Sequence, residues 1–212
     1  MNRVEIKQEA KAKIKGNLWN IIWPILVIGA VESILMSLFG GTPDFSNMEK
    51  VEIPTSYLVA TGVIGILMGI VNAGYIKYII NFTRTGKFNT SDILNTAKEK
   101  WLNILIANIL VGVIVGLCSL LFVIPGIIMA LAYSFVTYLV VDTDVSGSDA
   151  LSKSREMMKG YKWDFFVFGL SFIGWFILAP FTLFILFIWL MPYMTVAETI
   201  YYDRLKTLKK ID

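Results

Sequence analysis

Long charge-free stretches alternate with short polar stretches along this chain. Residues 101–141 and residues 165–197 contain no Asp, Glu, Lys or Arg, and they are 41 and 33 residues long. Because a helix rises about 1.5 Å per residue and the hydrocarbon core of a bilayer is about 30 Å thick, the first stretch is long enough for two crossings and the second nearly so. A soluble core could not bury both stretches, so the pattern predicts an integral membrane protein.

Polar segments and turn residues divide the chain into six expected spans. The spans are expected at residues 18–39, 57–80, 101–123, 127–141, 163–179 and 181–200. Pro125-Gly126 and Pro180 supply the uncharged turns expected within the second and third pairs of spans. Spans four and five are short, so each either crosses fully or is re-entrant. The expected fold is an all-α, polytopic membrane protein of three hairpins, with residues 1–212 as a single membrane domain.

A polar segment before each hairpin has the pattern of an amphipathic surface helix. These helices are expected at residues 3–16, 91–100 and 147–161. In the third, Ala150, Leu151, Ser154, Met157, Met158 and Tyr161 share one face, and the charged side chains take the other. Such a helix is expected to lie flat, with its apolar face in lipid and its cations toward anionic headgroups. Lys153, Arg155, Lys159 and Lys162 are the predicted surface for lipid or a partner.

The first and third surface helices also resemble each other in sequence. At a constant offset of 144 residues, Lys15 aligns with Lys159, Gly16 with Gly160 and Trp19 with Trp163. A middle copy, residues 92–98, matches residues 5–11. The pattern indicates either a threefold internal repeat or the same physics recurring at each entry to the membrane, where Trp and basic residues are favoured.

The distribution of basic residues predicts the topology. If the six spans form three hairpins, 18 of the 19 Lys and Arg lie on one side and only Lys50 lies on the other. The positive-inside rule then places the N- and C-termini in the cytoplasm, in a multi-pass protein of the cytoplasmic membrane. The net charge of +3 follows from this asymmetry. It does not call for a nucleic-acid partner.

The amino-acid composition limits the kinds of catalytic and metal-binding site that the chain can form. The chain has no His and one Cys, which excludes His-based catalysis, His-ligated metal sites and an internal disulfide. No phosphate-binding glycine loop, nucleophile elbow or metalloprotease motif occurs. We therefore expect no enzymatic activity, no metal and no cofactor. The acids Asp142, Asp144 and Asp149 favour helix capping before the third surface helix over a metal site.

A few polar residues lie within the expected spans. Glu32 is the acid furthest inside one, and it indicates either a proton or cation site facing the bundle interior or a packing residue. Ser119, Tyr133, Ser134 and Ser171 are the other candidates for buried polar positions. Lys77 and Glu198 lie near the cytoplasmic ends of their spans, where they either form an ion pair or extend toward water.

Several motifs resemble a known family. They are Ile124-Pro125-Gly126 with Tyr133, the run from Ser148 to Gly160, Trp163-Asp164, Leu170–Trp175, Pro192-Tyr193 with Tyr201-Tyr202, and an N-terminal set of Lys7, Ala10, Lys11, Lys15-Gly16-Asn17 and Trp19. Together they resemble the bacterial membrane family of unknown function numbered 975. The resemblance implies six helices in a Gram-positive-type cytoplasmic membrane and a distant similarity to glycerophosphodiesterase-associated membrane domains. It implies no activity and no functional residues.

Two functions are compatible with these observations. The first is a non-enzymatic envelope, assembly, stress or immunity factor that acts through lipid or protein contacts. Its expected partners are the bilayer, anionic lipid at the cytoplasmic face, and a membrane protein or a second copy of the chain. The alternative is a small proton- or cation-coupled transporter that uses Glu32.

Overall fold

The computed structural model describes residues 1–40, 53–183 and 185–211, and every regular element in these ranges is helical. The elements are α1 (Arg3–Ile14), α2 (Leu18–Phe39), α3 (Thr55–Thr85), α4 (Ser91–Glu99), α5 (Trp101–Leu121), α6 (Val123–Ala132), α7 (Val136–Asp142), α8 (Gly147–Met157), α9 (Lys162–Leu170), α10 (Ile173–Leu178), a 3₁₀ turn η1 (Pro180–Thr182) and α11 (Leu186–Lys209). The expected all-α class is confirmed.

Within the described residues, four segments are long and apolar enough to cross a membrane: α2, α3, α5 and Val123–Asp142, which comprises α6 and α7. A fifth candidate is the pair formed by α8 and Lys162–Leu178, which bends by 86° between its two parts. In α5, only 11% of the most apolar window is buried inside the protein, so most of its apolar side chains face outward. Membrane lipid is the environment that suits such a surface. The six-span arrangement remains a prediction.

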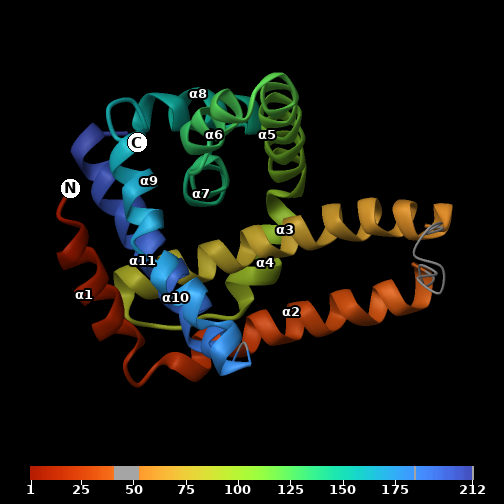
Figure 1. Ribbon diagram of the computed structural model, residues 1–212, viewed down its shortest axis with the longest axis horizontal. Helices are drawn as coiled ribbons and strands as arrows, with labels where there is room; N and C mark the ends of the chain where they lie inside the picture. Colours follow the sequence, from red (N-terminus) through yellow and green to blue (C-terminus); the bar gives the residue numbers. More distant parts are fainter. Residues whose placement is uncertain (41–52, 184, 212) are drawn as a thin grey trace.

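The α2–α3 hairpin extends away from the other helices (Figure 1). Its two helices run side by side, and the opposite end of the molecule holds α1, α11 and both chain termini. At that end Tyr75 and Tyr78 of α3 donate hydrogen bonds to the carbonyl oxygens of Ile21 and Asn20, at 3.1 and 2.7 Å. Because these carbonyls belong to the first turn of α2, the bonds hold the base of the hairpin together.

The turn between α5 and α6 differs from the prediction. The chain turns at Phe122, which is extended (φ −156°, ψ 142°), and Pro125 and Gly126 lie inside the first turns of α6. Pro is tolerated there because the first amides of a helix have no internal partner. Gly126 instead allows close helix contact, since a Cβ at this position would collide with Ser119 of α5.

Two of the three expected surface helices, α1 and α8, pack against protein. In α1, Ile6, Ala10 and Ile14 are buried, and the helix packs against α11. In α8 the apolar stripe packs against α5 and α7, and Ser154 donates a 3.0 Å hydrogen bond to the carbonyl oxygen of Ala132 at the end of α6. The expectation that these stripes lie in lipid is therefore corrected. The spans provide enough apolar surface at their ends to cover them.

Candidate functional site

The corner between α8 and α9 is built by a cap at one end and a glycine at the other. The Ser146 hydroxyl accepts a hydrogen bond from the Asp149 amide and donates one to its carboxylate, which starts α8. Gly147 then allows α8 to approach α5 closely, because a Cβ there would collide with the Asn103 carbonyl oxygen. After α8, Gly160 adopts a left-handed conformation (φ +86°), which reverses the chain into α9.

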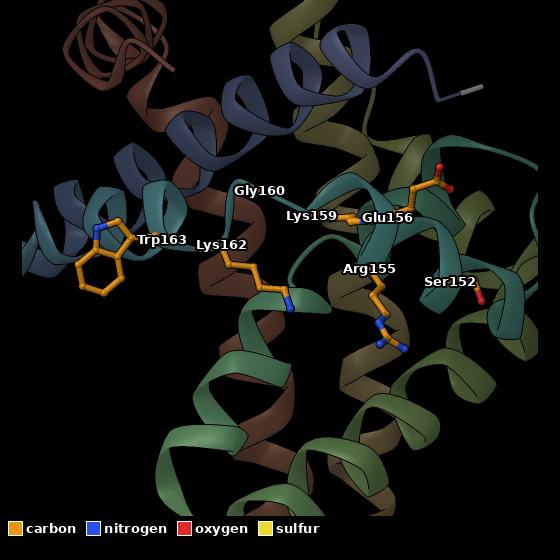
Figure 2. Close-up of a pocket in the computed structure, with 7 residues that line it drawn as sticks. All are labelled: Ser152, Arg155, Glu156, Lys159, Gly160, Lys162 and Trp163. Atoms are coloured by element: carbon orange, nitrogen blue, oxygen red, sulfur yellow. The ribbon is translucent and has the colours of Figure 1, made fainter.

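A basic surface pocket of about 840 Å³ lies at this corner. It is lined by Ser152, Arg155, Glu156, Lys159, Gly160, Lys162 and Trp163. Figure 2 shows the Arg155 and Lys162 side chains extending to the same side of the corner, with Trp163 beyond Lys162. The structure therefore gathers three of the four predicted basic residues around one pocket. Lys153, the fourth, is partly buried and is not among the lining residues.

The charge of the pocket is positive, and its edge is aromatic. Three cations line it against the single carboxylate of Glu156. Trp163 is 74% exposed, and its ring packs against Phe166 with centroids 5.4 Å apart. Lys209 of α11 donates a 3.0 Å hydrogen bond to the Lys159 carbonyl oxygen and lies over the Tyr161 ring. Three cations beside an exposed Trp suit a phosphate group that is attached to an apolar chain. Cations attract the phosphate, and Trp is favoured at the depth of lipid headgroups.

A buried ionic cluster joins the ends of α3, α7 and α11. The Asp142 side chain is 1% exposed, and it accepts hydrogen bonds from Arg84 at 2.5 and 2.9 Å, Lys206 at 2.8 Å and Tyr202 at 3.0 Å. Arg84 also pairs with Asp203 at 2.5 Å. Burial raises the pKa of the Tyr202 hydroxyl, and the adjacent Asp142 carboxylate raises it further, so Tyr202 remains protonated and donates its hydrogen bond.

A second set of polar contacts fastens α1 beside the basic pocket. Asp164, which follows Trp163, accepts a 2.8 Å hydrogen bond from Tyr201 and lies within 3.7 Å of the N-terminal ammonium group and 3.6 Å of Arg3. Arg204 of α11 bridges Glu5 and Glu9 of α1 at 3.0 and 2.7 Å. These contacts hold α1 and α11 against the first turn of α9, which also contains the pocket residues Lys162 and Trp163.

The polar candidates within the spans fall into two groups. Tyr133 is buried, and Ser134 is half-buried and donates a hydrogen bond to the Ala130 carbonyl oxygen. Glu32, Ser119 and Ser171 are exposed, so the expectation that they are buried polar residues is corrected. Ser119 nevertheless lies against Gly126 of α6. Glu32 faces outward because α2 packs on one side only, against α3 and the end of α11.

The remaining charged candidates lie in separate contacts. Lys77 lies 3.8 Å from the Asp142 carboxylate, and no described contact pairs it with Glu198. The expected helix capping is found, since Ser146 caps α8 with Asp149 in its first turn, whereas Asp142 belongs to the ionic cluster and Asp144 pairs with Lys100 at 3.3 Å. The ionic cluster was missed because its members are far apart in the sequence. The only sequence signal is that acids and bases occur together at the expected ends of the second, fourth and sixth spans.

Comparison with known proteins identifies a family but no individual relative. No curated protein and no solved structure matches the chain. A family model matches it in two overlapping sections, residues 1–131 and 120–209, which together contain both the basic pocket and the ionic cluster. The chain therefore belongs to the family described as a protein of unknown function, DUF975.

Proposed function

We propose that this protein is a non-enzymatic, six-span protein of the cytoplasmic membrane that binds the phosphate group of an anionic lipid at the α8–α9 corner. In this role it would act as an envelope, assembly, stress or immunity factor. The observation that carries the proposal is the pocket lined by Arg155, Lys159 and Lys162 beside the exposed Trp163. Cations at a membrane surface attract anionic lipid, and an interfacial Trp sets the depth of the site.

Matching features of the first and third surface helices support the six-span arrangement. Asn2 and Ser146, 144 residues apart, both cap their surface helices by accepting a hydrogen bond from the amide three residues later. Gly16 and Gly160, at the same offset, both have positive φ, of 83° and 86°. In the middle copy, Asn89 contacts Ser91 and Asp92 in a related way. The matching caps and glycines favour a common unit at α1 and α8, each followed by a hairpin in the membrane, whereas α4 has no side-chain cap and no left-handed glycine between it and α5.

Lipid counting by native mass spectrometry tests the proposal. The detergent-solubilised protein is offered phosphatidylglycerol and phosphatidylcholine. Replacing Arg155, Lys159 and Lys162 together with Gln is expected to reduce the preference for phosphatidylglycerol roughly tenfold or more, because each basic residue near an anionic surface contributes about 1 kcal/mol.

The matched control replaces three exposed lysines outside the pocket, Lys11, Lys87 and Lys98, with Gln. This variant carries the same change in net charge and should keep most of the preference. Equal losses in both variants would show that binding depends on net charge alone, and no loss in the pocket variant would contradict the proposal.

A further inference from the structure

A second pocket lies between α6, α9, α10 and α11. Its volume is about 310 Å³, at the lower end of the range for small-molecule sites. The rings of Phe165, Phe166, Phe168 and Phe176 line it together with Glu198. Glu198 lies one helical turn before Tyr201 and Tyr202, whose hydroxyls bind Asp164 and Asp142. The pocket is therefore just inside the layer of ionic contacts.

Glu198 supplies the pocket with a carboxyl group that has no protein counter-ion. It is the only charged residue among those that line the pocket. Within the described residues, its carboxyl group takes part in no hydrogen bond or ion pair, and the Tyr138 hydroxyl is a neighbour with which it interacts electrostatically. Lys77, the expected partner, is 3.8 Å from Asp142 instead. An ionisable side chain at membrane depth that faces a cavity marks a functional site, because placing it there is costly.

The aromatic rings around Glu198 favour a cation as the ligand. The centroids of Phe165 and Phe168 are 6.0 Å apart, and both rings pack on Tyr201, at 5.0 and 5.2 Å. The faces of such rings carry partial negative charge and bind ammonium groups. The same region already contains one example, since the Lys7 ammonium group lies 4.1 Å from the centroid of the Phe172 ring.

The residues at the edge of the pocket indicate what is attached to the cationic group of the ligand. Leu170, Ile173 and Phe176 contribute to the lining and are 42, 54 and 39% exposed, so the pocket opens through an apolar rim. A ligand that enters there would first be dissolved in hydrocarbon. We propose that this pocket binds an amphipathic organic cation, with its ammonium group between Glu198 and the phenylalanine rings and its hydrocarbon chain along the rim.

Equilibrium dialysis of octyltrimethylammonium tests this proposal, with the full chain in nanodiscs and empty nanodiscs as the background. We expect saturable binding of the cation, and no competition by octyl sulfate, which has the same chain and the opposite charge. Glu198→Gln should weaken binding at least tenfold. Phe176→Leu, which removes one ring at an exposed position, should weaken it several-fold. Glu32→Gln, which removes the exposed acid of α2, should leave it unchanged.

Three results would overturn the proposal: no binding above the empty nanodiscs, equal competition by octyl sulfate, or unchanged affinity in both pocket variants. If Glu198→Gln does not fold, the Phe176→Leu variant and the competition experiment decide the question. The lipid-binding variant at Arg155, Lys159 and Lys162 should bind the cation normally, so failure of this proposal is distinguishable from failure of the lipid-binding proposal.

Discussion

At the scale of single residues, Asp142 contributes most to holding the last helices together. Its buried carboxylate lies among Arg84, Lys206, Lys77 and Tyr202. Asp142→Asn would leave these cations facing one another without the central negative charge. Breaking a buried ion pair by removing one partner costs about 3–5 kcal/mol, and partial exposure of the cations reduces this to roughly 2–3 kcal/mol. We expect a clear fall in Tm, measured by circular dichroism in detergent.

Asp144→Asn is the matched control, because it makes the same change two residues away on a fully exposed side chain. It should leave the Tm nearly unchanged. Equal Tm values for the two variants would mean that the cluster contributes little to stability.

The difference between Asp142 and Asp144 also shows what could not be predicted from the sequence. Asp142 and Asp144 look alike in the sequence, and only the contacts of Asp142 with Arg84 of α3 and with Tyr202 and Lys206 of α11 distinguish them.

At the scale of elements, Gly160 is the residue on which the α8–α9 corner depends. Its φ of +86° strains any residue with a Cβ, at a cost of about 1–2 kcal/mol. Gly160→Ala should therefore lower the Tm, and Gly16→Ala should lower it similarly, since Gly16 has a φ of +83°. Gly169→Ala is the control, because Gly169 has an ordinary helical backbone and no atom within 4 Å of the added Cβ. A loss as large at Gly169 would show that the backbone conformation of Gly160 is not the cause.

The sequence predicted the elements well where periodicity or hydrophobic length determined them. The bounds of α2 were predicted to the residue, and the helices expected at residues 3–16, 91–100 and 147–161 correspond to α1, α4 and α8, because each has apolar residues at helical spacing. Prediction from the sequence failed where tertiary contacts determine the position of a turn or the surroundings of a helix face. Pro125 is compatible with the first turn of a helix as well as with a turn between helices. The apolar face of α8 can pack against protein as well as against lipid. The basic pocket could be predicted because its residues are close in the chain. The Glu198 pocket could not, since its walls come from separate helices.

At the scale of the whole molecule, the open question is how often the chain crosses the membrane. Length and hydropathy support four spans, or five with the bent pair, whereas the repeat and the distribution of Lys and Arg favour six. The two arrangements differ in the position of η1, between α10 and α11. Six spans place Phe181, which is 82% exposed, on the outer side, and a re-entrant last hairpin keeps it away from that side.

Labelling of single cysteines in intact cells with a membrane-impermeant maleimide separates these arrangements. In a Cys118→Ala background, Lys50→Cys, Phe122→Cys and Phe181→Cys should react before lysis, and Lys98→Cys and Leu208→Cys only after it. Phe122 tests the second hairpin and Phe181 the third, whereas Lys98 and Leu208 report on the predicted cytoplasmic side. Reaction of Phe181→Cys only after lysis would leave α9, α10 and α11 as a re-entrant unit. The Glu198 pocket would then open toward the inner leaflet alone, and any cation would have to enter from that side.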